Sequence, residues 1–195
     1  IEDPVLTQHH NVDGTVSALE NSYRCGVEKF IFASSSAVYG DTSSVPTKES
    51  IEPMPQSPYA EHKLASEEHC HNYYKSNRLR TTSLRYFNVF GPYQDPSSEY
   101  SAVIPKFINL ALNNKDLIIY GDGNSTRDFV FVDDVIQANL AAALSEKSDG
   151  EAINIAHGKT ISIGDLANMI IEITGSKSSV VHASPRAGDI VHSAA

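Results

Sequence analysis

Short apolar runs of strand length alternate along this chain with longer segments whose apolar residues recur at helical spacing. The run KFIFASSS at residues 29–36 and the run TTSLRYFNVFG at residues 81–91 are both predicted to be buried strands. A helix is predicted between them, over residues 59–75, because Ser57 can cap its first turn and Pro58 suits its first position. Alternating strands and helices are typical of a parallel sheet covered by helices, so we expect an α/β fold.

The same alternation continues on both sides of this region. Residues 11–25 carry apolar side chains at helical spacing, and Gly26 follows as a stop. In the second half, helices are predicted near residues 104–112, 134–145 and 162–174, and strands at residues 117–120, at 152–156 and around Val180. Loops are predicted at residues 41–58, which are rich in Pro, Ser and Thr, and at the stretch GDGNSTRDF of residues 121–129.

The net charge of the chain limits the classes of partner that it can bind. Its 195 residues carry 15 Lys and Arg against 24 Asp and Glu, a formal net charge of -9. This balance disfavours non-specific binding to nucleic acid or to an anionic membrane, so we expect neither as a partner. No apolar run approaches the roughly 18 residues that a membrane span needs. A bound phosphate would have to be met by a few well-placed Arg side chains.

The two cysteines indicate the cellular compartment of the protein. Cys25 and Cys70 lack CxxC spacing, which argues against a disulfide framework or a structural zinc site and favours the reducing cytoplasm. We expect both to be buried thiols. None of the eight His residues has metal-ligand spacing apart from the adjacent pair His9 and His10, so no metal site is predicted.

The sharpest local feature is the pair Tyr59 and Lys63 in the sequence YAEHK. Residues four apart share one face of a helix, so the phenol hydroxyl and the ammonium group can point into the same cleft. A nearby cation stabilises a phenolate and lowers the pKa of a phenol from its usual value of about 10. Tyr59 can then act as a general acid or base, whereas the simpler interpretation places the pair on a solvated helix face.

Three serines, Ser34, Ser35 and Ser36, end the first predicted strand. Ligands of α/β proteins bind at the carboxyl ends of parallel strands, so a hydroxyl there can bond a substrate alcohol and relay its proton to the tyrosine. The alternative is an ordinary polar transition from strand to loop. A nucleophilic serine is disfavoured, because the chain has no GxSxG elbow and no identifiable Ser/His/Asp set.

Six motifs stand in one order along the chain: NVDGT at residues 11–15, SSSAVYG at 34–40, YAEHK at 59–63, LRYFNVFGP at 84–92, GDGNSTRDFVFVDDV at 121–135 and PRAGDIVHS at 185–193. Together they resemble the extended short-chain dehydrogenases that act on nucleotide sugars. The chain is similar to NAD-dependent epimerases/dehydratases, and within them to the UDP-glucose and UDP-N-acetylglucosamine 4-epimerases.

The resemblance implies a Rossmann-like doubly wound parallel sheet, present in part, with a smaller α/β substrate-binding domain. It assigns residues 1–90 to the later part of the NAD-binding domain. Residues 91–195 would form mainly the nucleotide-sugar domain, with some segments returning to the Rossmann sheet. Relatives often form homodimers through the helix that carries Tyr59 and the helix that starts near Asn11, which implies a homodimer here.

The resemblance also implies roles for individual residues. Those of the reaction and the cofactor are Tyr59 as catalytic acid/base, Lys63 holding the nicotinamide ribose of NAD, Ser35 as catalytic hydroxyl, Ser36 as auxiliary hydroxyl, and Asn11 and Tyr86 close to the nicotinamide. Those of the UDP-sugar are Phe87 at the sugar, Asn88, Arg127 and Arg186 at the diphosphate, Asp189 at the ribose, and Ala102, Val103 and Tyr120 at the uracil.

Several of these residues also have a simpler interpretation. Arg127 and Arg186 could be surface ion-pair partners, and Asp189, which follows a glycine, could be a turn residue. Phe87 could serve core packing, and Asn88 and the cofactor residue Asn11 could satisfy only backbone groups.

The reaction implied by the resemblance is epimerisation through a transient 4-keto sugar. Dehydratases of this family carry an Asp-Glu pair directly after the catalytic hydroxyl, and nucleotide-sugar decarboxylases carry a Glu there. Here Ser36 and Ala37 occupy these positions, and neither can act as a carboxylic acid. A related UDP-uronate epimerase, decarboxylase or dehydratase stays an alternative, and the pathway implied is the supply of precursors for cell-surface polysaccharide.

Ser193 bears on the width of the sugar pocket. Four residues after the Asp of the RxGD motif, the epimerases restricted to plain hexoses resemble one another in a bulky Tyr, whereas relatives that accept N-acetyl sugars carry a small residue. Ser193 therefore leaves room for an acetamido group. We expect interconversion of UDP-GlcNAc and UDP-GalNAc, with UDP-Glc and UDP-Gal as further substrates.

The Gly-rich turn that holds the pyrophosphate of NAD in a Rossmann fold does not occur in this sequence. The glycines at 121 and 123 do not replace it, because they precede the TRDF sequence of the substrate half. We therefore expect an internal fragment of a longer enzyme that lacks the first βαβ units. A catalytically inactive UDP-sugar-binding fragment is the rival hypothesis.

Overall fold

The computed structural model describes residues 4–42, 45–96, 103–185 and 192–195. The chain divides into two compact units. The first unit comprises Ile1–Phe87 and Asp133–Ile155, and the second comprises Asn88–Val132 and Ala156–Ala195. The mixed α/β class with parallel strand pairing that the sequence predicts is confirmed.

The first unit is built on a parallel sheet in the order β1-β2-β6. Its strands are β1 (Lys29–Ser35), β2 (Arg80–Tyr86) and β6 (Ala152–Ile155). The register pairs Lys29 with Arg80 at the amino ends of β1 and β2, and Ser35 with Tyr86 at their carboxyl ends. The carboxyl end of β1 therefore presents the predicted catalytic hydroxyl next to the end of the neighbouring strand.

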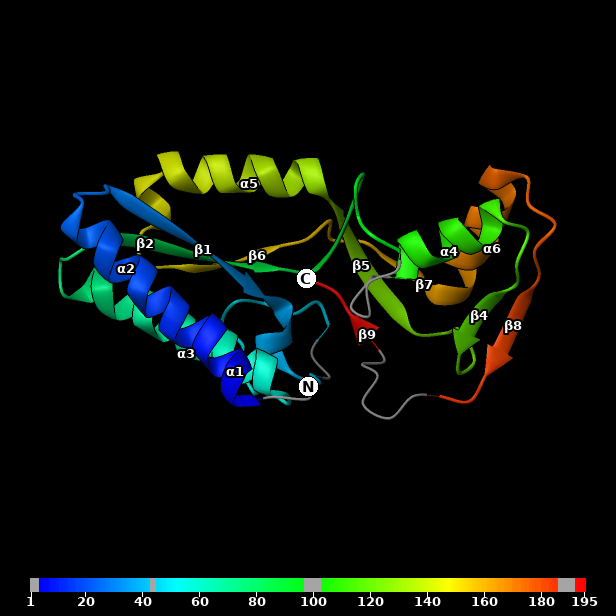
Figure 1. Cartoon of the computed structure of the whole chain (residues 1–195), viewed down its shortest axis with the longest axis horizontal. Coiled ribbons are helices and arrows are strands. Elements are labelled where there is room, and N and C mark those ends of the chain that lie inside the picture. The colour runs from blue at the N-terminus through cyan, green and yellow to red at the C-terminus, as the bar shows by residue number, and fades with distance from the viewer. Residues whose placement is uncertain (1–3, 43–44, 97–102, 186–191) are drawn as a thin grey trace. The chain divides into compact units, whose positions relative to one another are not determined.

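Helices cover both faces of this sheet (Figure 1). On one face lie α2 (Gly14–Arg24) and α3 (Pro58–Lys75), with α1 (Pro4–Gln8) and the π-helix η1 (His9–Asp13) leading into α2. The other face carries α5 (Val132–Leu144), which is followed by the short 3-10 helix η3 (Glu146–Ser148). The predicted start of α3 is confirmed, since the Ser57 hydroxyl accepts a hydrogen bond from the Ala60 amide at 3.2 Å and Pro58 occupies the first turn.

The two cysteines differ in their surroundings. Cys70 is 1% exposed and packs with Leu19, Phe32 and Leu79 between helices and sheet, and burial raises its pKa to about 12. The expectation that Cys25 is buried was wrong, because Cys25 is exposed. It caps the C-terminus of α2, where the chain turns away from the core into Gly26 with a positive φ of 70°.

The second unit is organised around the strand β5 (Thr126–Phe131). This strand pairs in parallel with β3 (Asn88–Phe90) and β9 (His192–Ser193) and antiparallel with β7 (Thr160–Ser162). A separate parallel pair joins β4 (Leu117–Tyr120) to β8 (Val180–Ala183). The helices α4 (Val103–Leu112) and α6 (Ile163–Thr174) pack on these strands over an apolar core (Figure 1).

Two sequence predictions need correction. The single strand expected at residues 81–91 is two strands, β2 and β3, which separate at Phe87 and belong to different sheets. The loop expected at residues 121–129 contains the start of β5. Asp128 makes this strand look polar, yet it is fully buried, because its carboxylate accepts hydrogen bonds from the amides of His157 (2.8 Å) and Gly158 (2.9 Å).

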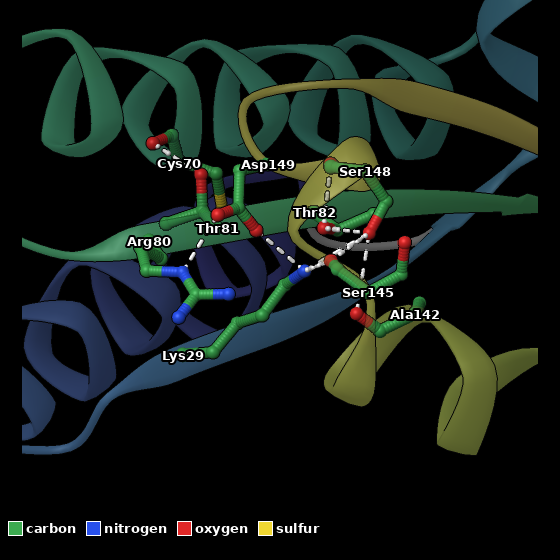
Figure 2. A network of polar contacts seen from close by, with 9 residues as sticks. All are labelled: Lys29, Cys70, Arg80, Thr81, Thr82, Ala142, Ser145, Ser148 and Asp149. Atoms are coloured by element: carbon green, nitrogen blue, oxygen red, sulfur yellow. Dashed lines mark hydrogen bonds and ion pairs between the residues drawn. The ribbon is translucent and has the colours of Figure 1, made fainter.

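A polar network joins the amino ends of β1 and β2 to the turn before β6 (Figure 2). The carboxylate of Asp149 forms ion pairs of 2.6 Å with both Lys29 and Arg80. Lys29 also donates to the carbonyl of Ser145 at 2.6 Å and to the hydroxyl of Ser148 at 2.9 Å. Burial favours the protonated form of Asp149, but these hydrogen bonds outweigh it and lower its pKa. This end of the sheet is therefore fixed by charge as well as by packing.

No helix among the described residues combines the length and the apolar character needed to cross a lipid bilayer.

Candidate active site

Helix α3 places Tyr59 and Lys63 on one face, four residues apart. The Lys63 ammonium nitrogen lies 5.8 Å from the centroid of the Tyr59 ring and 5.0 Å from that of Phe32. It donates a hydrogen bond of 2.9 Å to the carbonyl oxygen of Ala33, near the end of β1. Burial lowers the pKa of Lys63. Tyr59 is 39% exposed, so the residue is accessible at the surface of the first unit.

The predicted catalytic hydroxyls lie at the carboxyl end of β1. Ser35 is the last residue of this strand and caps the short 3-10 helix η2 (Ser36–Tyr39), where its Oγ accepts the Ala37 amide at 3.2 Å. Ser36 is the first residue of η2. Because Lys63 bonds the carbonyl of Ala33 on the same strand, the structure gathers the lysine and the serine segment at one end of the sheet.

The two further residues predicted near the cofactor also belong to the first unit. Asn11 lies within the π-helix η1, and its carbonyl oxygen accepts a hydrogen bond of 3.2 Å from Ser66 on α3. Tyr86 ends β2 in register with Ser35, and its hydroxyl donates to Oδ1 of Asn139 on α5 at 2.9 Å. Asn11 is thus tied to the helix that carries Tyr59, and Tyr86 adjoins the serine segment. π-turns inside helices often occur at functional sites.

A cavity of about 450 Å³ lies within the second unit. Four predicted substrate residues line it: Asn88, Val103, Tyr120 and Arg127. Apolar side chains form much of the remaining wall, among them Phe107, Leu110, Ile119, Phe129 and Ile163. A mostly apolar wall with a few polar groups is typical of a small-ligand site.

The pairing of β5 with β3 and β9 positions the polar side chains of this second unit. The Asn88 amide donates to the carbonyl of Asp128 at 3.0 Å, and Arg127 Nη1 donates to the carbonyl of Thr126 at 2.9 Å. The register of β5 and β9 places Ser193 directly opposite Arg127. The structure therefore brings the residue predicted to set the sugar width next to a residue predicted to bind the diphosphate.

Some predicted residues are not gathered into this cavity. Phe87 belongs to the first unit and is only 7% exposed, so it is a core residue in this structure. Ala102, Arg186 and Asp189 lie outside the described residues.

Lys106, which none of the sequence motifs singles out, also lines the cavity. It is the one charged residue of α4, whose sequence is VIPKFINLAL. A single cation within an otherwise apolar helix was a signal that could have identified it, because a lysine can pack its apolar stem against such a helix face while its ammonium group stays available to a ligand. Lys106 and Arg127 give this cavity two cationic side chains.

Three comparisons with known proteins bear on this site. The sequence model described as "NAD dependent epimerase/dehydratase family" matches residues 1–156. A UDP-N-acetyl-alpha-D-glucosaminuronate decarboxylase of Bacillus cytotoxicus is 39% identical over 178 residues, which cover 88% of this chain and 54% of that protein. A UDP-glucose 4-epimerase of Mycolicibacterium smegmatis is 35% identical over 191 residues, which cover 97% of this chain and 60% of that protein.

Among solved structures, the UDP-N-acetylglucosamine 4-epimerase of Methanobrevibacter ruminantium M1, in complex with UDP-N-acetylmuramic acid, matches with a TM-score of 0.95. It is 39% identical, and the match covers 100% of this chain and 62% of that one. The chain therefore spans about three fifths of the length of these relatives.

Proposed function

This chain belongs to the NAD dependent epimerase/dehydratase family, and from that premise we propose that the protein carrying it is an NAD-dependent UDP-sugar 4-epimerase. Its substrates would be UDP-GlcNAc and UDP-GalNAc, with UDP-Glc and UDP-Gal as further substrates. The observation that carries the proposal is the pairing of Tyr59 with Lys63 on one face of α3, with Lys63 hydrogen-bonded to the end of the strand that bears Ser35.

The residues at this end of the sheet fit the nicotinamide riboside part of NAD. An ammonium group has three N–H donors, and among the described residues the carbonyl of Ala33 is the one acceptor that Lys63 meets. Two donors are thus left for ribose hydroxyls. The chain holds no Gly-rich turn for a dinucleotide pyrophosphate, so we assign only the nicotinamide riboside end to these residues. When bound, NAD would supply a hydride acceptor for the carbon that bears the reacting hydroxyl.

The side chains of the first unit would handle the proton of the reaction. The phenolate of Tyr59 takes the proton from the sugar C4 hydroxyl and later returns it, and the Lys63 ammonium stabilises the negative charge on the phenol oxygen. The hydroxyls of Ser35 and Ser36 would orient the sugar hydroxyl by hydrogen bonding. Each of these roles requires that the side-chain oxygen of Tyr59, Ser35 or Ser36 lies within hydrogen-bond distance of the substrate.

The second unit would hold the nucleoside diphosphate. Its cavity of about 450 Å³ suits a small ligand. We assign the diphosphate to Arg127, whose planar guanidinium matches phosphate geometry, and to Lys106 as a second cation. Asn88 would add an amide donor, and Val103 and Tyr120 would line the uracil position. Arg186, Asp189 and Ala102 keep the substrate roles implied by the resemblance.

Epimerisation is favoured over the other reactions of the family by the residues after Ser35. Ser36 and Ala37 open η2 and carry no carboxyl group, so they offer no acid for the elimination of water. The 39% identity to a nucleotide-sugar decarboxylase keeps a UDP-uronate reaction as the second candidate. Incubation of the protein with NAD and each UDP-sugar, followed by separation of the products, distinguishes the two. A released CO2 or a pentose product would overturn the 4-epimerase.

Oligomeric state and location complete the proposal. Tyr23 on α2 is 42% exposed, and Tyr74 on α3 is 38% exposed. Exposed apolar residues on these helices support a homodimer that uses α2 and α3. The two cysteines without a bond between them support the cytoplasm. Supply of UDP-N-acetyl sugars for cell-surface polysaccharide would be its use.

A Ser193→Tyr variant tests the proposed substrate. Tyrosine at this position of β9 fills the space left for the acetamido group, so we expect turnover of UDP-GlcNAc to fall much more than turnover of UDP-Glc. Ser193→Ala is the matched control, because it keeps a small side chain, and both activities should stay near those of the wild type. Equal losses with both substrates in the Tyr variant would contradict the assignment of the sugar pocket.

A Lys106→Met variant tests the cavity of the second unit. Methionine keeps the apolar stem and removes the charge, so we expect UDP to bind on the order of 10-fold more weakly, as for the loss of one charge-assisted hydrogen bond. Titration calorimetry with UDP at low and high salt measures this change. Lys115→Met is the control, since Lys115 is exposed and does not line the cavity. Unchanged UDP affinity in Lys106→Met would remove Lys106 from the site.

A further inference from the structure

A buried ion pair crosses from α3 to the sheet of the first unit. Glu67 and Arg85 are each only 6% exposed. Arg85 donates through Nε to both carboxylate oxygens of Glu67, at 3.0 and 3.2 Å, and through Nη2 to Oε2 at 2.6 Å. Buried ion pairs contribute little net stability in general, because removing both charges from water offsets their attraction. Stability alone therefore does not account for this ion pair, and the contacts that its two side chains make indicate a second role.

Both partners of this ion pair also hold the segment that carries the catalytic serines. The Ser34 hydroxyl donates to Oε1 of Glu67. Arg85 Nη1 donates to the Tyr39 hydroxyl at 2.8 Å, and its guanidinium lies 4.8 Å from the centroid of the Tyr39 ring. Residues 34 and 39 are thus fixed to one ion pair, and the two hydroxyls predicted to meet the sugar lie between them.

The hydroxyl of Tyr39 extends the network to the last strand of the sheet. It donates to Oδ1 of Asn154 on β6 at 2.7 Å. The amide group of Asn154 donates in turn to the carbonyl of Thr47, in the loop that follows the serine segment, at 2.9 Å. Hydrogen bonds therefore hold the segment after β1 to two other strands, β2 and β6, and to the loop that follows the segment.

The same ion pair is anchored on the helix face that carries the acid/base pair. Tyr59, Lys63 and Glu67 follow one another at intervals of four residues, so they lie along one face of α3. We propose that Arg85 is a positioning residue, which through Glu67 and Tyr39 sets the separation between the Ser35 and Ser36 hydroxyls and the Tyr59–Lys63 pair. This inference rests on the proposed epimerase function. It assigns Arg85, Glu67 and Tyr39 no contact with substrate.

Positioning of this kind affects the rate more than binding. A misplacement of about 1 Å in a reacting group costs on the order of 10²-fold in rate. The nucleoside diphosphate is assigned to residues of the second unit, so its binding does not depend on the serine segment. The expected signature is a loss of kcat with an unchanged KM.

A Tyr39→Phe variant is the sharpest test, because it removes one hydroxyl and leaves the ring and the ion pair in place. In the protein that contains this chain, we expect kcat for UDP-GlcNAc to fall on the order of 10-fold or more, with KM within 2-fold of the wild type. Tyr73→Phe is the matched control. It removes a hydroxyl that donates to Glu20 at 2.8 Å in the same unit, away from the serine segment, so kcat should not change.

A second measurement does not depend on turnover. Amide hydrogen exchange should quicken in residues 34–40 of Tyr39→Phe and stay as in the wild type in α2. As a further control, Asp149→Asn weakens the other charged network of the sheet (Figure 2), which lies at the opposite strand ends, roughly 20 Å along β1 at about 3.3 Å per residue. It should lower the melting temperature with kcat unchanged.

The outcomes separate the inference from the function on which it rests. A wild-type protein that epimerises no UDP-sugar would overturn the proposed function, and unchanged exchange in residues 34–40 of Tyr39→Phe would overturn the positioning role even then. An active wild type with full kcat in Tyr39→Phe would overturn the positioning role alone. The positioning role would also be overturned if Asp149→Asn and Tyr39→Phe had the same melting temperature and the same loss of kcat, because lowered stability would then explain both losses. Loss of kcat with KM and melting temperature preserved supports it.

Discussion

Replacing Tyr59 with phenylalanine should lower turnover in the proposed epimerase reaction by about 10²–10⁴-fold, the usual contribution of a positioned acid or base. The variant keeps the aromatic ring over Lys63 and loses only the oxygen that accepts and returns the proton. Among the described residues, the two other tyrosines near the serine segment already have partners: the Tyr39 hydroxyl bonds Arg85 and Asn154, and the Tyr86 hydroxyl bonds Asn139. The measurement is the rate of UDP-GalNAc formation from UDP-GlcNAc at saturating substrate.

Two controls accompany this result: the affinity of Tyr59→Phe for UDP, and the turnover of a variant at another tyrosine of α3. UDP affinity should be that of the wild type, because the diphosphate is assigned to residues of the second unit. Tyr74→Phe changes an exposed tyrosine on the same helix and should leave turnover unchanged. A Tyr59→Phe protein that retains more than a tenth of the wild-type rate would place the proton on another group and contradict the proposed mechanism.

The parts of the fold that follow from local pattern were predictable from the sequence. The apolar run after Lys29 is a strand because its side chains are of the types that pack in a buried sheet, and β1 occupies Lys29–Ser35. The start of α3 follows from Ser57 and Pro58, whose capping geometry is decided within four residues. The helix in turn fixes Tyr59 and Lys63 on one face, so this part of the site needed no tertiary information.

The strand β5 was not predictable in the same way. Its sequence TRDFVF begins with a cation and an anion, which local pattern assigns to a loop. Asp128 is nevertheless fully buried, because amides of His157 and Gly158, about thirty residues further on, donate to it. Burial of a charged group depends on partners that are distant in sequence, and these partners are known only when the fold is known.

The same limit applies within the candidate site. Lys106 reaches the cavity through the packing of α4, and the ion pair joins Glu67 on α3 to Arg85 on β2, 18 residues further along the chain. Periodicity identifies which face of a helix is apolar, but it does not identify the strand residue that a buried glutamate meets. The pair of Tyr59 and Lys63 is a local motif, whereas the contacts proposed to position it are tertiary.

The net charge of -9 makes the placement of the cations informative. In an acidic chain, a cationic side chain inside a cavity or beneath a helix is not part of a generally basic surface. Lys106 and Arg127 line one cavity of the second unit, and Lys63 lies beside Tyr59 in the first. The proposed function gives these three cations two different tasks, recognition of phosphate and stabilisation of a phenolate.

A Lys63→Met variant should lose turnover and keep its stability, which separates function from folding at this residue. We expect turnover to fall by about 10²–10³-fold, as for the loss of one preorganised group that stabilises a developing charge. Lys75→Met, at the exposed end of the same helix, is the control and should show the wild-type turnover.

The direction of the stability effect follows from the lowered pKa of Lys63. Burial disfavours its charged form, so the folded protein holds this proton less tightly than the unfolded chain, in which a lysine has a pKa of about 10.4. At neutral pH the charge therefore costs folding free energy, and the cost disappears as pH rises through the folded pKa toward the unfolded value. Lys63→Met lacks this cost, so its melting temperature at pH 7 should equal or exceed that of the wild type, and the difference should shrink at higher pH. A clear loss of stability at pH 7 would show that the contacts with Ala33 and Phe32 hold the fold together, and that Lys63 is not retained for function alone.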